Sequence, residues 1–400
     1  MIEADRRKEI LKRERSTIYL QGEPLLGGYY TEEEIEVVVE TIRRSMDPTV
    51  GFGFMVEEIL SFEREFAEFC GTEHCVCING AGTGLDMAMM ALDLEPGDEV
   101  IVPAINFKAA PLSVIGQGGK VVWCDVDERT FQADPEDVER RITPRTRAIY
   151  PVHMNGLSAP MDDLLDIAER HPHPKHGPLK VIGDAARACG GKYKDTRIGK
   201  KGWMTVFSFH TQKNMTTLGE GGAIATDDGE LADRLRAIRQ FGGGHTWGTN
   251  YKMTKVQAAV GSVQLRRLDE MIEARRRVAH ERHKLLEGVP ELTLPYEPLD
   301  CWHTFYLYTC LVPEAWAGEK RDQLIEIMQK EYGVGCTVAN PPQYIQTPFL
   351  REMTLGQDLP RSNKLAARLF CVSIHPLMTT EHNATICAAL IETIERLRNE

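Results

Sequence analysis

Short apolar runs alternate with helix-like segments between residues 75 and 227, and this alternation constrains the fold more than any other feature. A helix pattern at 161–171, for example, follows the apolar run that ends at His153. Strands that alternate with helices build a largely parallel sheet, so the sequence predicts an α/β domain. The predicted strands are 75–78, 99–104, 120–126, 148–153, 180–185, 205–209 and 222–227.

The pattern changes near residue 260. The stretch 256–286 contains few helix breakers and predicts one long helix. Beyond Gly288 we expect a strand at 304–312 and helices at 320–331 and 379–398. We therefore divide the chain into a charged N-terminal segment, a large domain and a smaller α+β domain, with the ranges 1–30, 31–265 and 266–400.

Two helix faces stand out before the first predicted strand. Thr31 and Glu34 have the spacing of a capping box, which predicts a helix that begins there. Apolar residues then recur on one face of that helix at Ile35, Val38, Val39 and Ile42. A second stripe at helical spacing predicts core packing by Phe62, Phe66 and Phe69.

Composition argues against several classes of function. The net charge of −12 is unlike that of a nucleic-acid binder, whose footprint is usually basic. No apolar run reaches about 18 residues, so we expect no transmembrane helix. The N-terminus is charged throughout and lacks the apolar core of a signal peptide, and its basic cluster predicts a solvated helix face.

The ten cysteines are scattered and lie mostly in apolar strands. This pattern is typical of reduced, buried thiols in a cytoplasmic protein. The close pair Cys75 and Cys77 has no second pair to complete a zinc site, so we expect core packing there and no metal site.

A glycine-rich turn follows the first predicted strand. It reads Gly80-Ala81-Gly82-Thr83-Gly84 and precedes a helix pattern. Small residues let backbone N–H groups approach an anion, and a helix N-terminus favours negative charge. The turn is neither a Walker A loop nor a complete dinucleotide fingerprint, and a plain tight turn explains it equally well.

Chemically useful side chains follow other predicted strands. Phe107 follows the strand at 99–104, Asp184 ends the strand at 180–185, and Lys213 lies five residues after Ser208. Ligands of open α/β sheets sit at the carboxyl ends of the strands. A lysine amine, a carboxylate, an aromatic ring and a phosphate loop form the set that pyridoxal phosphate needs.

The chain resembles the DegT/StrS family of sugar aminotransferases over roughly residues 20–400. The resemblance is carried in order by the blocks "FEREFAEFCG", "AGTGLDMAMMAL", "PGDEVIVPAINFKA", "ITPRTRAIYPVHMNG", "GDAARACGGKYK", "SFHTQKNMTTLGEGGAIATDD" and "NYKMTKVQAAVGSVQL". It implies a fold type I pyridoxal-phosphate enzyme. The large domain would hold a mostly parallel seven-stranded sheet between helices, followed by a smaller C-terminal α+β domain.

The resemblance assigns roles residue by residue. Lys213 matches the lysine that forms a Schiff base with the cofactor and moves protons during transfer. Asp184 matches the carboxylate on the pyridine nitrogen, and Phe107 matches the ring that stacks on the cofactor. The expected phosphate contacts are Gly82, Thr83 and Ser208 from the same chain, and Asn250 from the second subunit of a homodimer.

Other positions depart from the family pattern. Arg187 stands where relatives often carry Gln or His, and we expect it beside the cofactor or a substrate carboxylate. The alternative is a surface arginine, or one that only supports the residues around the cofactor. The run 339–344 differs from the usual family sequence near the sugar, so Asn340 and Tyr344 are candidate acceptor contacts. His303 matches a position that can touch substrate, with a satisfied core histidine as the alternative.

These assignments predict an aminotransferase that moves an amino group from L-glutamate or L-glutamine to a keto-sugar or a keto-cyclitol of the scyllo-inosose type. Such a reaction serves amino-sugar, aminoglycoside or polysaccharide biosynthesis. Desolvation and the neighbouring cofactor should lower the pKa of Lys213. A nucleotide-linked keto-sugar is the alternative acceptor.

Other functions fit the residues less well. By resemblance, a dehydratase on this fold usually replaces the lysine with histidine, and a regulatory relative would tolerate loss of Lys213 or Asp184, both of which are present. A nicotinamide dehydrogenase would need a glycine fingerprint in an early βαβ unit, and none is convincing here.

Overall fold

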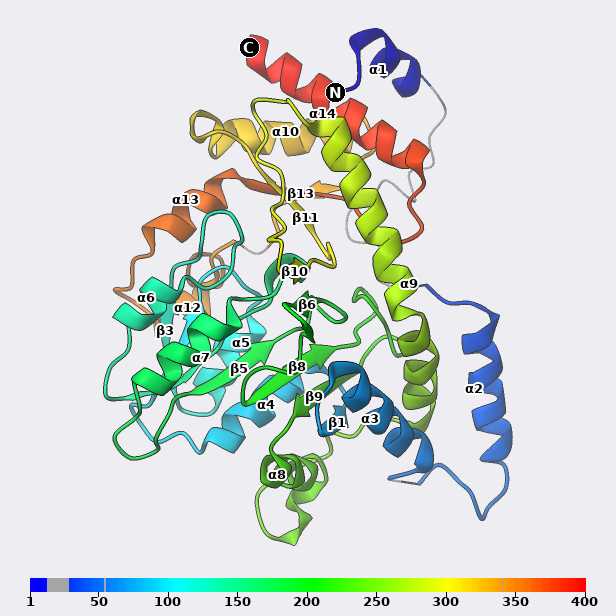
Figure 1. Cartoon of the computed structure of the whole chain (residues 1–400), viewed down its shortest axis with the longest axis vertical. Coiled ribbons are helices and arrows are strands. Elements are labelled where there is room, and N and C mark those ends of the chain that lie inside the picture. The colour runs from blue at the N-terminus through cyan, green and yellow to red at the C-terminus, as the bar shows by residue number, and fades with distance from the viewer. Residues whose placement is uncertain (13–28, 54, 340) are drawn as a thin grey trace.

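The computed structural model describes residues 1–12, 29–53, 55–339 and 341–400 (Figure 1). A seven-stranded sheet has the order β1-β9-β8-β5-β4-β2-β3. β9 runs antiparallel to β1 and β8, and the other neighbours are parallel. The seven predicted strands and the mostly parallel sheet are therefore confirmed, although the strand predicted at 148–153 lies earlier, at Thr146–Ile149. The strands are β1 (His74–Ile78), β2 (Glu99–Pro103), β3 (Lys120–Cys124), β4 (Thr146–Ile149), β5 (Lys180–Asp184), β8 (Met204–Ser208) and β9 (Gly222–Thr226).

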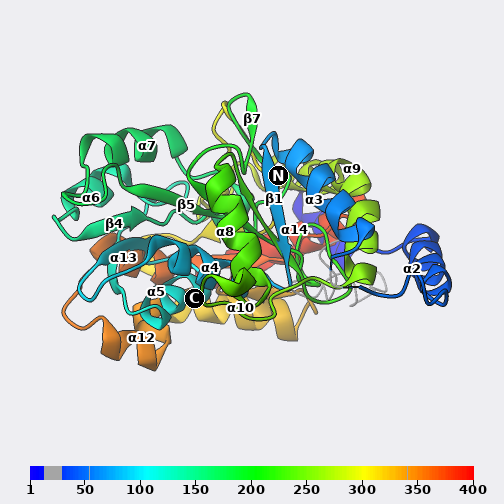
Figure 2. The ribbon, with the colours of Figure 1, turned by 90° about the horizontal axis from the view of Figure 1, so that it is seen from below.

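Helices cover both faces of this sheet because successive strand residues point to opposite sides. In β2, Val100 and Val102 pack in the same core as α4 and α5, whereas Ile101 packs in the core of α7. Figure 2 accordingly shows α6 and α7 on one side of the sheet and α4 and α5 on the other. These flanking helices are α3 (Glu57–Cys70), α4 (Ala81–Leu92), α5 (Ala109–Gly116), α6 (Pro135–Arg140), α7 (Met161–Arg170) and α8 (Gly229–Arg239).

A long helix, α9 (Lys255–Leu286), links the large sheet to a second core and confirms the predicted helix. The core of α3 includes Leu265 and Leu268 of α9, and the second core includes Val278 and Leu286. The proposed domain boundary at 265 thus falls inside α9. The second core surrounds the antiparallel strands β11 (Tyr308–Leu311), β13 (Leu369–Val372) and β12 (Cys336–Thr337) together with α10 (Glu319–Lys330) and α14 (Thr380–Asn399).

Shorter elements connect these layers. The predicted strand at 304–312 is shorter in the structure because β11 begins only at Tyr308. Phe305 adopts a φ of 48°, a left-handed conformation that no strand residue has. The remaining short elements are β6 (Lys192–Tyr193), β7 (Thr196–Arg197), β10 (Cys301–Trp302), α11 (Gln343–Gln346), α12 (Pro348–Met353) and α13 (Pro360–Arg368).

The N-terminal helix α1 (Ala4–Leu11) is not a fully solvated basic face, and that prediction was wrong for its central arginine. The Arg7 side chain is buried and forms ion pairs with Glu392, at 2.7 Å, and Glu395 of α14. Ile10 packs in the second core beside it. An arginine can bury its aliphatic stem while its guanidinium meets carboxylates, which sequence periodicity does not reveal.

The helix α2 (Glu32–Arg44) lies at the edge of the molecule beside α9 (Figure 1). The Glu34 carboxylate accepts the backbone N–H of Thr31 at 2.6 Å, so the capping box is confirmed. Glu34 is buried against Arg267 and Gln264 of α9, while the stripe stays exposed at Ile35, Val39 and Ile42. An exposed apolar face on a folded helix offers a surface to another chain.

The predicted phenylalanine stripe of α3 forms core. Phe62 and Phe66 are fully buried, and Phe69 packs partly buried beside them. Cys75 and Cys77 are also buried, and among the described residues no cluster of His, Cys, Asp and Glu is arranged to hold a metal ion. Within the same described part of the chain, no helix has the length and apolar character needed to cross a membrane.

Candidate active site

The large cavity of the molecule, about 610 Å³, opens at the carboxyl ends of the parallel strands. Asp184 ends β5, Ser208 ends β8, and Asn79 follows β1. The structure brings together in this cavity seven residues that the sequence singled out, namely Gly82, Thr83, Phe107, Asp184, Arg187, Ser208 and Lys213.

The N-terminus of α4 forms one wall of the cavity. The helix begins at Ala81, and its N-cap residue, Gly80, has no side chain to bond the first backbone N–H groups. Those groups and the positive end of the helix favour an anion. A Cβ on Gly222 of β9 would lie 2.9 Å from the Ala81 nitrogen, so glycine lets this turn sit close to the sheet. A Cβ on Gly82 would meet nothing within 4 Å, which leaves room on the cavity side.

Asp184 supplies a buried carboxylate to the floor of the cavity. Its exposed fraction is 4%, and its Oδ1 accepts the backbone N–H of Ala186 at 2.9 Å. Burial raises the pKa of the Asp184 carboxyl group, and the hydrogen bond from Ala186 and the charges of Lys213 and Arg187 offset part of that rise. A cationic group placed against a buried carboxylate stabilises the charged form of that carboxylate.

Lys213 enters the cavity from the loop that joins β8 to β9. The loop closes on itself through backbone hydrogen bonds from Phe209 to Gly221 at 2.8 Å and from Thr211 to Gly219 at 3.0 Å. Gly219 and Gly221 have φ values of 111° and 155°, which side chains rarely allow. The tight loop thereby fixes the base of the Lys213 side chain.

The end of that side chain meets a residue that the sequence did not single out. Lys213 Nζ donates to the Tyr306 hydroxyl at 3.2 Å and lies 4.9 Å from the centre of its ring. The Arg187 guanidinium lies 5.4 Å from the same ring centre. Tyr306 lies between β10 and β11, far from Lys213 in sequence, and no motif points to it.

Other cavity residues were missed although they lie in recognised segments. His210 and Gln212 flank the cavity within the lysine loop, and Glu220 lies 4.0 Å from His210 as an exposed carboxylate. Asn79 directly follows the first strand, one residue beyond Ile78, which is level with Ser208 in the sheet. The position of Asn79 and His210 just after β1 and β8 was a usable signal.

Phe107 stands where two cavities meet. Its ring is 53% exposed and lines both the large cavity and a neighbouring one of about 460 Å³. Lys108 and Gln343 line the neighbouring cavity, and Gln343 is held to the loop after β2 by a hydrogen bond from its Nε2 to the Asn106 carbonyl oxygen at 3.1 Å. The 341–348 segment therefore borders the rim of the large cavity.

Two sequence candidates lie in the core instead of the large cavity. His303 is 2% exposed, stacks on Phe305 at 4.1 Å, and accepts that residue's backbone N–H at Nδ1, so the core alternative describes it. Burial lowers the pKa of His303 to about 3. Tyr344 packs 5.9 Å from Trp123 and donates to Asn363, which turns it away from the cavity.

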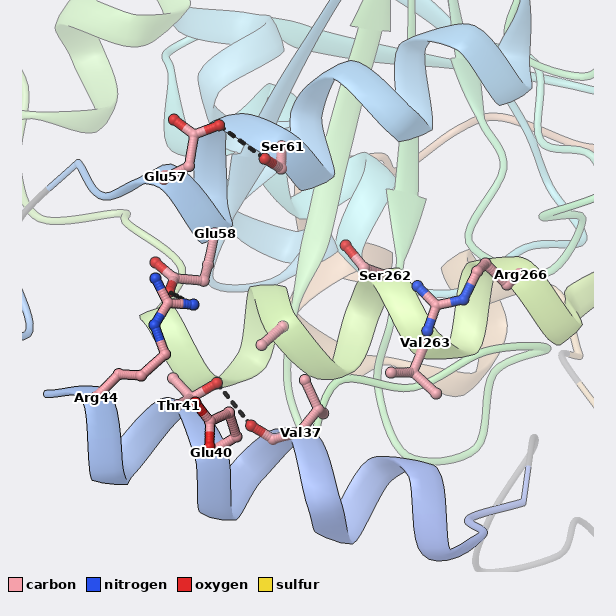
Figure 3. Close-up of a pocket in the computed structure, with 11 residues that line it drawn as sticks. Val37, Glu40, Thr41, Arg44, Glu57, Glu58, Ser61, Ser262, Val263 and Arg266 are labelled. Atoms are coloured by element: carbon pink, nitrogen blue, oxygen red, sulfur yellow. Dashed lines mark hydrogen bonds and ion pairs between the residues drawn. The ribbon is translucent and has the colours of Figure 1, made fainter.

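The last two candidates stand apart for different reasons. Asn250 is exposed and does not line the large cavity of its own chain. Asn340 lies outside the described residues. A further cavity, about 270 Å³, separates α2 from α3 and α9 (Figure 3). Two of its charged groups, Arg44 and Glu58, pair with each other at 3.7 Å, and the two cavities have no described lining residue in common.

The groups around the large cavity fit pyridoxal phosphate. The N-terminus of α4 offers backbone N–H groups to a phosphate, and Phe107 offers an unpacked ring face. Asp184 is a buried carboxylate for a protonated ring nitrogen, and Lys213 is an amine for an aldehyde.

Comparison with known proteins supports the same conclusion. GDP-perosamine synthase of Caulobacter vibrioides is 39% identical to the chain over 334 residues, which cover 82% of this chain and 85% of that protein. The dTDP-3-amino-3,4,6-trideoxy-alpha-D-glucose transaminase of Streptomyces venezuelae is 33% identical over 379 residues, covering 91% and 96%. The crystal structure of S. venezuelae DesV superposes with a TM-score of 0.83 at 34% identity, covering 91% of this chain and 96% of that one.

The model of the DegT/DnrJ/EryC1/StrS aminotransferase family matches residues 31–391, which is nearly the whole chain. This match confirms the resemblance drawn from the sequence blocks, the fold type I architecture and the cofactor. The chain is a pyridoxal-phosphate-dependent aminotransferase and belongs to the DegT/DnrJ/EryC1/StrS family.

Proposed function

We propose that the large cavity binds the cofactor and that Lys213 is its covalent partner. The observation that carries this proposal is the convergence of Lys213, Asp184 and the N-terminus of α4 on one cavity. Bound there, pyridoxal phosphate supplies an aldehyde that can take up an amino group and a ring that can accept electrons. Thr83 and Ser208 would bind its phosphate beside the α4 N–H groups.

The residues divide the remaining work. Lys213, once its amine is free, takes the proton from the α-carbon of the donor and returns it on the cofactor side, as a general base and then a general acid. Asp184 keeps the ring nitrogen protonated, because a positive charge beside the buried carboxylate offsets the unfavourable effect of burial on its charged form. Arg187 lines the same cavity and would bind a carboxylate of L-glutamate or L-glutamine.

The acceptor we propose is a nucleotide-linked keto-sugar, in preference to a free keto-cyclitol. The second cavity begins at Phe107 and offers space beyond the place of chemistry. Among the residues that the structure describes, its lining contains one cation, Lys108, and no carboxylate, so it suits a phosphate-bearing substituent. The names of the two curated relatives, GDP-perosamine synthase and a dTDP-sugar transaminase, support the same class.

A spectroscopic titration tests this function. L-Glutamate or L-glutamine should remove the visible band of the bound cofactor, and the right acceptor should restore it. The panel contains GDP- and dTDP-linked keto-hexoses, the corresponding sugar phosphates without a nucleoside, and a free keto-cyclitol. Lys213→Ala is the control, which should bind the cofactor without the band.

Each outcome of the titration is informative. Return of the band with the nucleotide-linked sugars alone supports the proposal. Return with the free cyclitol alone refutes the proposed acceptor while leaving transamination intact. Loss of water from the sugar without consumption of the donor would indicate the dehydratase alternative.

We also propose a homodimer in which Asn250 completes the phosphate site of the partner subunit. The exposure of Asn250 and the outward apolar stripe of α2 support a second chain against this one. Asn250→Asp would place a carboxylate near the phosphate, and Lys213→Ala removes the reactive amine. In an equal mixture about half of the dimers are hybrids, and each hybrid has one of its two sites intact. Mixing should therefore restore about a quarter of wild-type activity. Absence of any recovery in mixed dimers would contradict a shared site.

A further inference from the structure

Tyr306 provides the hydroxyl that meets the amine of Lys213. A lysine ammonium is a point charge on a flexible four-carbon stem, and its direction must be fixed by its surroundings. Here Lys213 Nζ donates to the Tyr306 hydroxyl at 3.2 Å while the ring lies 4.9 Å away. The phenol is buried, with an exposed fraction of 3%, so water has little access to compete for the hydrogen bond.

The backbone around Tyr306 is held rigidly against the main sheet. Thr304 donates its N–H to the Gly156 carbonyl oxygen at 3.0 Å, and Leu307 donates to the Asn155 carbonyl oxygen at 3.2 Å. These acceptors lie in a 3₁₀ turn, η2 (Met154–Gly156). A Cβ on Gly156 would lie 2.8 Å from the Tyr306 nitrogen, so the two segments are in direct backbone contact.

The η2 turn is also fixed to β5, the strand that ends at Asp184. His153, the residue before η2, donates its backbone N–H to the Asp184 carbonyl oxygen at 2.9 Å. The path from Asp184 through η2 to Tyr306 is therefore a chain of backbone hydrogen bonds. It joins the segment that carries the phenol to the strand that carries the carboxylate.

Backbone strain at the neighbouring residue sets the direction of Tyr306. Phe305 has a φ of 48°, which is unusual for a bulky residue and requires support from its surroundings. That support comes from the His303 ring stacked on Phe305 at 4.1 Å. A regular strand through residue 305 would not present residue 306 in this direction, because strand side chains alternate on a fixed period.

We propose that Tyr306 is a positioning residue that holds the free amine of Lys213 between its covalent bonds to the cofactor. This inference rests on the proposed role of Lys213. The phenol oxygen accepts from the ammonium, and the ring face adds an attraction to the same charge. The other charged or titratable groups around the amine are Asp184, Arg187, His210 and Glu220 of the cavity wall.

The test compares Tyr306→Phe with Tyr344→Phe. The first keeps the ring beside Lys213 and removes only the hydroxyl. The second removes a hydroxyl of similar burial that lies outside the cavity. Both variants are expected to unfold within about 2 °C of the wild type, because one hydrogen bond is small against the unfolding entropy of a chain this long.

The first readout needs neither an acceptor nor turnover. Trace acetylation of the apoprotein, quantified by mass spectrometry across a pH series, reports the fraction of Lys213 in the neutral form. Hydrogen bonds to charged groups are stronger than those to neutral groups, so removing the hydroxyl should lower the apparent pKa of Lys213 by roughly 0.5 to 1 unit. Tyr344→Phe should leave the labelling curve unchanged.

The second readout is the donor half-reaction of the holoenzyme. Tyr306→Phe should slow proton transfer by roughly 10- to 100-fold and change the donor KM by less than about threefold, because the lost bond orients the base and not the donor. Identical labelling curves for Tyr306→Phe and the wild type overturn the proposal. A failure to find any acceptor would instead count against the proposed function, since neither readout requires one.

Discussion

Two buried histidines, His153 and His303, make the stability of this protein depend steeply on pH. Each is 1–2% exposed and accepts a backbone N–H at Nδ1, from Ala159 at 3.0 Å and from Phe305 at 2.8 Å. Burial lowers the pKa of each imidazole to about 3. Protonation at Nδ1 would also remove the acceptor from those bonds, which reinforces the neutral form.

The sign and size of the effect follow from the two pKa values. In the unfolded chain a histidine has a pKa near 6.5, so below that pH the unfolded state binds protons that the folded state does not, and stability falls as pH falls. Between pH 7 and pH 5 each histidine removes about 2 kcal/mol, and the pair removes about 4 kcal/mol. The loss continues until the pH approaches 3, where the folded-state imidazoles also titrate.

Urea unfolding of the apoprotein at pH 7, 6 and 5, followed by tryptophan fluorescence, measures this loss. In His153→Asn and His303→Asn the amide oxygen can accept the same backbone N–H but cannot titrate. Each variant should be about 2 kcal/mol less sensitive to the change from pH 7 to pH 5 than the wild type. His245→Asn, at an exposed histidine, is the matched control and should behave as the wild type. Equal pH sensitivity in the wild type and the double variant would refute the reasoning.

Further substitutions test other parts of the structure. Gly222→Ala should destabilise the apoprotein by about 1–3 kcal/mol and weaken cofactor binding, because the new Cβ would lie 2.7 Å from the Phe207 carbonyl oxygen. Gly82→Ala has room for its Cβ and should stabilise the apoprotein by about 0.5–1 kcal/mol. Urea unfolding and cofactor titration measure both effects. Asp184→Asn should abolish most activity in a donor half-reaction assay without lowering apoprotein stability in urea, because burial already disfavours its charge. Arg7→Ala should cost about 1–3 kcal/mol by leaving two carboxylates of α14 without their partner, and kcat should not change.

The cofactor side of the cavity could be predicted from the sequence because its residues follow strands directly. Asp184 and Ser208 are the last residues of β5 and β8, and the parallel order of those strands brings both to one edge of the sheet. Gly82 lies in the first turn of the helix after β1. In each position a local pattern and the sheet topology together determine where the side chain lies.

The acceptor side could not be predicted in the same way, because tertiary packing decides it. Tyr344 fills a core position against Trp123, although it follows two prolines in a segment that borders the second cavity. His303 is held by stacking on Phe305, which no spacing rule reveals. Arg7 is buried by carboxylates at the far end of the chain. Such contacts join distant segments, and a periodicity read along one segment carries no information about them.

One error in strand position has a functional meaning. The apolar run 304–312 predicts a continuous strand, but the strand begins only at Tyr308, because Phe305 takes a left-handed conformation. Sequence rules that agree along most of a chain tend to fail at functional or strained positions. Here the failure falls one residue before Tyr306, whose hydroxyl meets Lys213. If the strain at Phe305 serves to aim Tyr306, then relieving it with Phe305→Gly, which tolerates positive φ, should loosen the contact to Lys213. The same change removes a ring that is 1% exposed, so it should also destabilise the protein by roughly 3–5 kcal/mol. The apparent pKa of Lys213 in Phe305→Gly should therefore move toward its value in Tyr306→Phe. A value equal to that of the wild type would show that the strain at Phe305 does not direct Tyr306 toward Lys213.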